Sequence, residues 1–494
     1  MAGFKKIHWF LWLLPLFFVL HGVKENFGFI DMGSASLLLL NYWIYAAVAW
    51  ILFYLIFKNA LSSSWMSAAL LAYYLFFGAV KEFFIAIPSI SFLGKYSVML
   101  SAGILGLSML CYFLYQHPAK RSKFFTYINT LFAILILAEG IQIVALGRED
   151  SKGLSIYFTQ KGMDIKSSCA PTTKPNIYFL LFDEYESSIS LQQRFQFFNP
   201  LDSSLKAEQF HVLQDARSNY NFTPFSIASL LNMDYLQGIQ NPQSVTVEDY
   251  AKCNTLIKNN RLLQFLHTKG YQLLNYSIFD LAGHPTEVEQ QLLPLQSKLI
   301  SDRTLYAHVK KDIGWKLMEY FPFNYLFRMD YMQHHHNNQL FFQKVIDAST
   351  HAQTHPFFLY AHFYMPHPPF YVNENGELRN SIQDERQGNA ADYLAYALYT
   401  NKKIMQMIQS IKKNDPKGII LLMGDHGYRN QKEEKTHLFN ALNALYFPDQ
   451  QYASFYSNVS HVNQFRLVLN KIFCTNLPLL KDRQILLKDK GELP

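Results

Sequence analysis

NIYFLLF, residues 176–182, is an almost unbroken apolar run of strand length. Continuous rather than alternating hydrophobicity predicts a strand buried on both faces, as in a parallel α/β sheet. Similar runs recur as PFFLYAHF, residues 356–363, and GIILLMGD, residues 418–425. Helix-like stretches, such as residues 260–269 and 392–412, lie between the runs. We therefore predict an α/β fold with a doubly wound sheet, in which ligands bind at the carboxyl ends of the strands.

Side chains that bind metals end or follow each of these predicted strands. They are Asp183 and Glu184 after the first strand, His362 and His367 at the second, and Asp425 and His426 at the third. Because the carboxyl ends of neighbouring parallel strands lie at one edge of a sheet, we expect these groups to converge. Carboxylate with imidazole is a ligand set typical of zinc or manganese, whereas calcium and magnesium prefer oxygen ligands alone.

The segment SNYNFTPFSIASLLN, residues 218–232, contains the candidate nucleophile. Proline suits the first position of a helix and the preceding threonine suits the N-cap, so Thr223 is predicted at a helix N-terminus. Backbone N–H groups and the helix dipole favour an anion there, such as a phosphate or sulfate ester. A threonine hydroxyl is a poor nucleophile until a cation lowers its pKa, so this role requires a metal beside it. The alternative is that Thr223 only caps the helix.

The first part of the chain, up to residue 146, is rich in Leu, Phe, Ile, Ala and Tyr. Five apolar stretches there approach the roughly 20 residues that a membrane-spanning helix needs. They are residues 8–23, 35–57, 65–87, 97–115 and 124–146. Lysine and arginine are more frequent in the loops on the same side of the membrane as the N-terminus. The positive-inside rule predicts that this side is cytoplasmic.

An odd number of spans then places the remainder of the chain outside the cytoplasm. We predict a five-helix transmembrane bundle over residues 1–147, a linker over residues 148–175 and an extracytoplasmic catalytic domain over residues 176–494. The protein would be an integral protein of the inner or plasma membrane.

Charge and cysteine content narrow the class of protein further. The formal net charge is +7, from 44 Lys and Arg against 37 Asp and Glu, without the basic blocks of a nucleic-acid groove. We therefore expect no nucleic-acid partner. Of the four cysteines, Cys111 falls in an apolar stretch. Cys169, Cys253 and Cys474 allow one disulfide, and the sequence does not choose the pair.

The motifs and their order resemble the sulfatase and metal-dependent phosphotransferase branch of the alkaline phosphatase superfamily. PNIYFLLFDE resembles the opening strand of that family, with Asp183 as its metal-binding acid, and LLMGDHGYR resembles its Asp-His-Gly motif. NVSHVNQF, residues 458–465, resembles its Ser-His-Val-Asp signature, with Asn463 in place of the aspartate. The resemblance covers about residues 175–473.

The nucleophile position separates the branches of this family. Sulfatases have Cys-x-Pro-Ser-Arg before a Leu-Leu pair, and matching that pair to residues 230–231 places Thr223 at the cysteine and Ile227 at the arginine. Threonine cannot become formylglycine, so a true sulfatase is disfavoured. Threonine together with five membrane helices resembles the lipid A phosphoethanolamine transferases and the lipoteichoic acid synthases.

This resemblance implies that Thr223 attacks a phospholipid head group, forms a phospho-threonine and passes the group to an envelope glycan or lipid acceptor. It also implies one divalent metal ion, zinc or manganese. The site residues implied are Asp183, Glu184, Thr223, Asp425 and His426 for the metal, and Thr223, His367 and His437 for catalysis.

Two alternatives remain from the sequence. One is a phosphodiesterase or sulfuric ester hydrolase of the same fold, which an assay of head-group release with and without acceptor separates from a transferase. The other is a catalytically inactive relative that binds a lipid or an envelope partner, which metal analysis and a Thr223→Ala variant would reveal.

Overall fold

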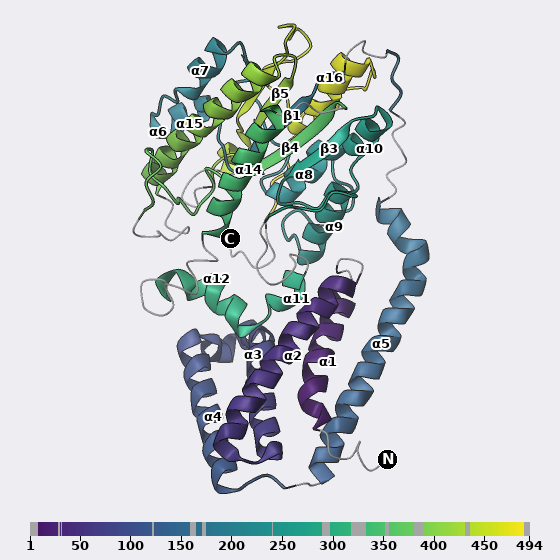
Figure 1. The fold of residues 1–494 in the computed structure, drawn as a ribbon, viewed down its shortest axis with the longest axis vertical. Coiled ribbons are helices and arrows are strands. Elements are labelled where there is room, and N and C mark those ends of the chain that lie inside the picture. Colours follow the sequence, from purple (N-terminus) through teal and green to yellow (C-terminus); the bar gives the residue numbers. More distant parts are fainter. Residues whose placement is uncertain are drawn as a thin grey trace. The chain divides into compact units, whose positions relative to one another are not determined.

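The computed structural model describes residues 8–27, 30, 32–120, 123–158, 165–169, 174–239, 241–288, 297–317, 332–350, 355–379, 389–429 and 435–488. The chain separates into two compact units. One comprises Met1–Ile156 with Gln290–Phe327, and the other Tyr157–Glu289 with Arg328–Pro494. The first is helical and the second is built on a sheet (Figure 1).

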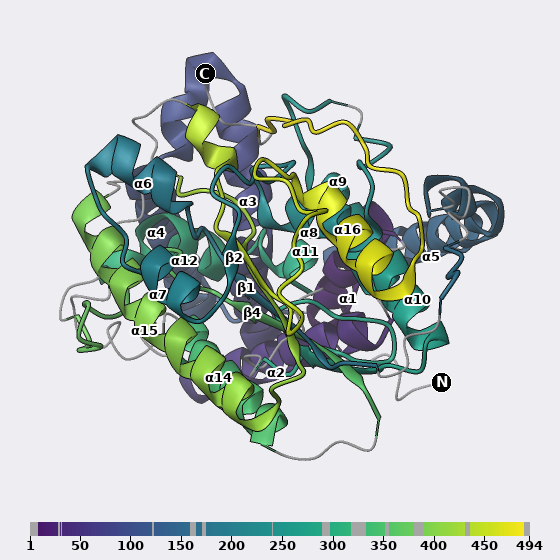
Figure 2. The same ribbon diagram turned by 90° about the horizontal axis from the view of Figure 1, so that it is seen from above.

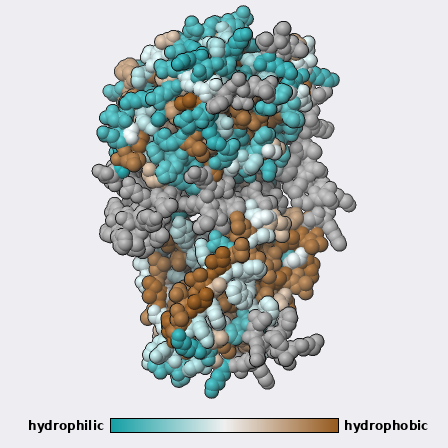
Figure 3. Space-filling model, viewed as in Figure 1, coloured by the Kyte–Doolittle hydropathy of each residue, from teal (hydrophilic) through white to brown (hydrophobic). Residues whose placement is uncertain are grey.

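The helical unit contains a run of consecutive long helices. They are α1 (Trp9–Glu25), α2 (Met32–Phe57), α3 (Ala60–Ala86), the short 3-10 helix η2 (Pro88–Gly94), α4 (Tyr96–Gln116) and α5 (Lys123–Phe158). Among the described residues, α2, α3, α4 and the part Phe124–Leu146 of α5 are long and apolar enough to cross a membrane. These four helices indicate a membrane anchor, and large hydrophobic side chains cover much of the surface of the unit (Figure 3).

Four of the five predicted spans are confirmed, and the fifth, at α1, stays a prediction. This helix has 17 residues, at the lower limit of the roughly 17–25 residues that can cross a bilayer. Phe10, Leu14 and Phe18 on α1 are buried in a core shared with α2 and α3. Part of the apolar surface of α1 therefore packs within the bundle.

Two helices from a later part of the sequence belong to the same unit. α11 (Lys298–Ser301) and α12 (Leu305–Leu317) come from the chain between two strands of the sheet. Gly78 of α3 donates a backbone hydrogen bond to the Arg303 carbonyl at 2.9 Å. A Cβ atom at Gly78 would lie 2.5 Å from that oxygen, so glycine is required for this close approach.

Ionisable side chains inside the helical unit have partners of opposite charge. Glu139, which is only 8% exposed, accepts a hydrogen bond from His21 Nδ1 at 2.9 Å and lies 3.1 Å from Lys24 Nζ. Lys81 Nζ lies 2.7 Å from Asp312 Oδ2 and ties α12 to α3. Pairing reduces the cost of burying each charge.

In the described part of the second unit, six strands form one mixed sheet. They are β1 (Ile177–Phe182), β2 (His211–Val212), β3 (Gln272–Tyr276), β4 (Phe357–Phe363), β5 (Ile419–Gly424) and β6 (Asn443–Tyr446), in the order β2-β6-β5-β1-β4-β3. β5, β1 and β4, the three strands that the sequence predicted, pair in parallel, and β3 pairs in parallel with β4. β6 pairs antiparallel with β5 on one side and with β2 on the other. No α-helix lies between β5 and β6 in the described residues, and a parallel pairing requires a crossover connection.

Helices cover both faces of the sheet, which confirms the doubly wound architecture (Figure 2). Ile177, Phe179 and Leu181 of β1 pack on one side, and the alternate residues of the strand pack on the other. The first side carries α8 (Thr223–Asn232), α9 (Val247–Lys258), α10 (Arg261–Thr268) and α16 (His461–Phe473), and the second α7 (Leu201–Ala207), α14 (Gln333–Thr350) and α15 (Ala390–Asn414). Burial on both faces explains the continuous apolar run.

A disulfide joins Cys169 to Cys474, 305 residues further along the chain. Cys169 follows α5 in the sequence, and Cys474 directly follows α16. Cys253 and Cys111 are free cysteines. The structure thus selects one of the pairings that the sequence left open.

Candidate active site

The register of the sheet brings two aspartates to the same edge. Phe182 of β1 pairs with Phe363 of β4 on one side and with Gly424 of β5 on the other. Asp183 and Asp425 are the next residues of β1 and β5, so both leave the sheet at one level. Both are buried, at 2% and 0% exposure.

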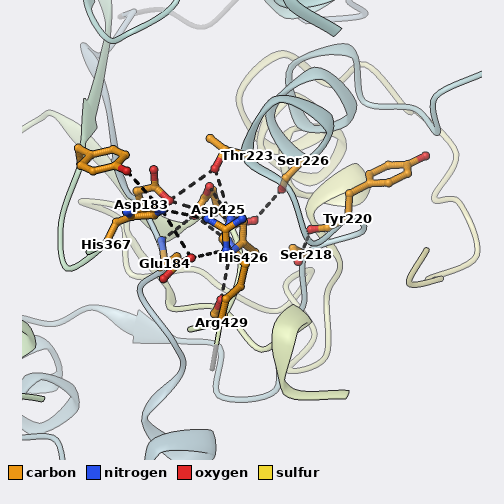
Figure 4. A network of polar contacts seen from close by, with 12 residues as sticks. Asp183, Glu184, Ser218, Tyr220, Thr223, Ser226, His367, Asp425, His426 and Arg429 are labelled. Carbon is orange, nitrogen blue, oxygen red and sulfur yellow. Dashed lines mark hydrogen bonds and ion pairs between the residues drawn. The ribbon is translucent and has the colours of Figure 1, made fainter. Parts of the chain in front are cut away.

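Four of the residues expected at the site meet there. Ligand atoms of Asp183, Asp425 and His426 lie within 4.8 Å of one another. The hydroxyl of Thr223 lies 3.5 Å from Asp183 Oδ1 and 3.3 Å from His426 Nε2 (Figure 4). Side chains that are far apart in the sequence therefore form one group.

The chemistry of this group fits a divalent cation. His426 Nδ1 lies 2.9 Å from the Gly427 carbonyl, which only accepts, so Nδ1 carries the proton and Nε2 presents its lone pair. Asp425 Oδ1 accepts the backbone N–H groups of Glu184 at 2.9 Å and His426 at 2.8 Å. Asp425 Oδ2 is buried without a hydrogen-bond partner. This buried Asp-Asp-His group can bind a metal ion.

The electrostatics of the two aspartates also favour a cation. Burial and the neighbouring Asp425 and Glu184 carboxylates raise the pKa of Asp183 well above its usual value. Burial alone would raise the pKa of Asp425, but His426 and His362 hold it below its usual value. Two buried carboxylates this close repel each other unless a proton or a cation lies between them.

Thr223 is the first residue of α8 rather than its N-cap, which corrects the prediction. Phe222 occupies the N-cap and makes no side-chain capping bond, and Pro224 is the second helical residue. The hydroxyl of Thr223 therefore contacts the aspartate and histidine side chains instead of capping the helix. Ile227, further along α8, is buried in the hydrophobic core, so its position supplies no cation.

Glu184 takes a different direction from Asp183. Its backbone has a left-handed φ of +58°, which breaks the alternation of the strand. The carboxylate forms an ion pair and hydrogen bond with Arg429 and lies 3.6 Å from His367 Nε2. A metal-binding role for Glu184 stays a prediction, because the group of metal-ligand atoms consists of the other two acids and His426.

His367 lies beside the same arginine. Its Nδ1 donates to the Pro368 carbonyl, so its Nε2 accepts from Arg429 Nη2 at 2.9 Å. Burial lowers the pKa of His367 to about 4. The neutral ring therefore orients the guanidinium in this arrangement.

His437 belongs to a second polar group. It lies in the 3-10 helix η5 (Lys435–Phe439), with Nδ1 3.3 Å from Ser190 Oγ. Ser190 donates to Glu186, which is paired with Arg194, and burial raises the pKa of Glu186 to about 7. A Cβ at Gly427 would lie 2.3 Å from the His437 carbonyl, so the backbone of η5 packs against the Asp-His-Gly loop. The catalytic role of His437 stays a prediction.

Sequence reasoning assigned no role to Arg429 and none to His461, the first residue of α16. His461 Nδ1 lies 3.3 Å from Ser226 Oγ, which donates to the Asp425 carbonyl at 2.6 Å. Burial lowers the pKa values of His461 and His362 to about 4, and their Nε2 atoms have no hydrogen-bond partner. Charge balance was the available signal for Arg429, because the predicted site held three carboxylates and no permanent cation.

Asn463, which replaces the aspartate of the Ser-His-Val-Asp signature, has a local explanation. Its Nδ2 donates to Asp482 Oδ1 at 3.0 Å and to the Leu480 carbonyl at 2.7 Å. Its Oδ1 accepts from the Leu480 N–H at 2.9 Å. An aspartate at this position would repel Asp482, so the amide fits this chain.

The sulfatase family model matches residues 203–465, more than half of the chain, and the chain therefore belongs to the sulfatase family. Membership in this family implies hydrolase or transferase activity in general. No curated protein sequence matches the chain.

Several solved structures resemble the second unit at low identity. The C-terminal periplasmic domain of EcEptC from Escherichia coli has 13% identity and a TM-score of 0.40, covering 67% of this chain and 96% of that one. Its complex with Zn has 12% identity and a TM-score of 0.39, with the same coverage. A putative sulfatase from Bacteroides thetaiotaomicron has 13% identity and a TM-score of 0.40, covering 63% and 73%. Similarities this weak assign no substrate or reaction to this chain.

Proposed function

We propose that the protein is a membrane-anchored, metal-dependent phosphotransferase that moves a phosphoryl-linked group, such as phosphoethanolamine or glycerol phosphate, through Thr223. One observation carries the proposal. The Thr223 hydroxyl, at the N-terminus of α8, lies within 3.5 Å of Asp183 and His426, which form one buried group of ligand atoms with Asp425. A hydroxyl in this position suits nucleophilic attack on an anionic ester.

The reaction proceeds through two displacements at phosphorus. Thr223 Oγ1 forms a bond to the phosphorus of a phospholipid head group, the bond to the lipid oxygen breaks, and the proton lost by Thr223 ends on the leaving alkoxide. An acceptor hydroxyl then displaces Thr223 from the phospho-threonine, and its proton returns to Thr223. The hydroxyl of Thr223 is thereby regenerated for the next cycle.

The residues around Thr223 have distinct parts in this scheme. Asp183, Asp425 and His426 would hold zinc or manganese, and the bound ion would supply a positive charge that lowers the pKa of the threonine hydroxyl and offsets charge on the phosphoryl oxygens. The first N–H groups of α8 face the same oxygens. His367 orients Arg429, and His437 remains a candidate for proton transfer to the leaving group.

The predicted orientation of the membrane helices and the disulfide support an extracytoplasmic location for the reaction. The four apolar helices hold the second unit at a bilayer, which keeps a lipid donor at high local concentration. The Cys169–Cys474 disulfide fits an oxidising compartment outside the cytoplasm. We therefore place the reaction on the extracytoplasmic side of the inner or plasma membrane, with an envelope glycan or lipid as acceptor.

A covalent adduct tests the proposal. The full-length protein is incubated with phospholipid labelled in the head-group phosphate, quenched and digested, and the peptide that contains residues 218–232 is examined for label. Thr223→Ala should abolish the label, whereas Thr255→Ala on α9, a matched threonine outside the site, should retain it. Label on another peptide would refute Thr223 as nucleophile. Head-group release that is independent of any acceptor would identify a hydrolase.

A further inference from the structure

Arg429 is the permanent cation beside the buried carboxylates of the described site. Its side chain is 34% exposed, whereas that of Glu184 is 2% exposed and that of His367 is 11% exposed. Arg429 thus connects the buried group to solvent. The centre of its guanidinium lies 5.9 Å from the ring of Phe222, the residue before Thr223.

Two neighbours hold the guanidinium by one side only. Arg429 Nε donates to Glu184 Oε1, and Nη2 donates to His367 Nε2 at 2.9 Å. Nη1 makes no hydrogen bond to any residue that the structure describes, and the second N–H of Nη2 is also without a protein acceptor there. The fork-shaped edge of the side chain, which suits two oxygens of one oxyanion, is therefore unused.

The charge at this edge is permanent. Burial alone would lower the pKa of Arg429, but Glu184 and Asp183 raise it above its usual value. The neighbouring histidine provides no alternative charge, because burial lowers the pKa of His367 to about 4. Arg429 therefore supplies a permanent positive charge beside the carboxylates that neighbour Thr223.

Helix α8 does not duplicate this charge. Ile227 is buried in the hydrophobic core, and the N-terminal half of α8 carries no lysine or arginine. Figure 4 shows Thr223, Glu184, His367 and Arg429 gathered around Asp183 and Asp425. The nucleophile and the guanidinium thus border the same group of buried acids, on different elements of the chain.

We propose that Arg429 binds the tetrahedral oxyanion, phosphoryl or sulfuryl, that Thr223 attacks, through Nη1 and the outward N–H of Nη2. This inference rests on the proposed function for the identity of the nucleophile. Lysine cannot replace arginine in this role, because a single ammonium group cannot contact Glu184 and also present two parallel N–H groups to an oxyanion.

The first experiment measures binding of inorganic phosphate and of sulfate to the full-length protein by calorimetry. Arg429→Lys should weaken binding at least about tenfold, as expected for loss of charge-assisted hydrogen bonds. Thr223→Ala should change binding less than threefold, because it leaves the guanidinium in place. Arg217→Lys is the matched control, because that arginine is exposed. Unchanged affinity in Arg429→Lys would overturn the inference.

A second measurement needs no substitution at the site. Phenylglyoxal modifies accessible arginines, and mass spectrometry follows the rate at Arg429 and Arg217 in the unaltered protein. Saturating phosphate or sulfate should slow the modification of Arg429 at least about tenfold and leave Arg217 unchanged. Protection by phosphate alone indicates a phosphoryl substrate, and protection by sulfate alone a sulfuryl substrate. Equal rates at Arg429 with and without both anions would overturn the inference.

Failure of the anion-binding inference can be distinguished from failure of the proposed transfer reaction. Protection of Arg429 without a labelled adduct on Thr223 would support the anion site and reject the transfer chemistry. An adduct on Thr223 without protection of Arg429 would support the transfer chemistry and reject the anion site.

Discussion

The helical unit and the sheet edge both bury ionisable side chains, but they treat them differently. In the helical unit, Glu139 lies between His21 and Lys24, and Asp312 is paired with Lys81. At the sheet edge, the carboxylates of Asp183 and Asp425 lie together in one buried group, and Asp425 raises the pKa of Asp183. Because neighbouring buried carboxylates repel each other unless a proton or a cation lies between them, the difference separates groups that hold the fold from groups arranged for a ligand.

The largest expected effect is on catalysis. Thr223→Ala should reduce head-group transfer at least about 10³-fold, since loss of a nucleophile removes the covalent route. Glu139→Gln, in the helical unit, should leave the turnover rate within a factor of two. Transfer is measured from labelled phospholipid in nanodiscs, with thermal unfolding as the check that both variants fold. Equal losses in the two variants would contradict the distinction between the regions.

The next effect concerns metal and stability. Asp183→Asn should weaken zinc or manganese binding by more than the 10–100-fold typical of an outer-shell change. The metal-free variant should unfold at a higher temperature than the metal-free parent, because the amide removes repulsion with Asp425. Metal content by mass spectrometry and thermal unfolding with chelator measure both quantities. A lower unfolding temperature without metal would mean that the carboxylate serves the fold instead.

Protonation provides a third test. His362 has a pKa of about 4 in the folded protein against an ordinary value of 6.5, because of burial. Between pH 4 and 6.5 the unfolded chain binds more protons than the folded protein at this position. The free energy of unfolding is therefore unaffected by His362 above pH 6.5 and falls as the pH is lowered toward 4. The loss amounts to about 3 kcal/mol at most.

Denaturant unfolding of the full-length protein between pH 4 and 7 measures this dependence. His362→Gln should make the decline in unfolding free energy at low pH shallower. His355→Gln is the matched control, because His355 is exposed. An equal dependence of unfolding free energy on pH in the parent and in His362→Gln would show that protonation of His362 does not destabilise the folded protein.

The smallest effect is expected in the helical unit. Lys81→Met and Asp312→Asn should each lower stability, with a coupling of about 1 kcal/mol in a double-mutant cycle for this partly buried pair. Neither should change phosphate binding at Arg429. The cycle is measured by unfolding in nanodiscs. A coupling energy of zero would show that the Lys81–Asp312 pair does not stabilise the helical unit.

Local patterns predicted the parallel centre of the sheet and the convergence of Asp183, Asp425 and His426. Continuous apolar runs report burial on both faces, and parallel strands place their ends together. The antiparallel β6 was not predicted, because its apolar run is short and its direction depends on the connection after β5. The N-cap of α8 was predicted one residue too late, because helix ends depend on tertiary contacts.

The partner of Glu184 was beyond reach of the sequence for a related reason. Adjacent residues after a strand read as equivalent ligands until the backbone direction is known, and the φ of +58° at Glu184 sends its side chain to Arg429. The pairing of Cys169 with Cys474 likewise depends on how α16 returns to the start of the unit. Long-range closure of this kind leaves no local pattern.

That same bond changes how the molecule comes apart. A single proteolytic cut anywhere between Cys169 and Cys474 yields two pieces that stay covalently joined, because the disulfide bridges the 305-residue separation. The distal piece therefore remains attached to the membrane anchor, and the nicked chain runs as one species until thiol is added. Shedding of the second unit from the membrane by such a cut would require a reductant as well as a protease.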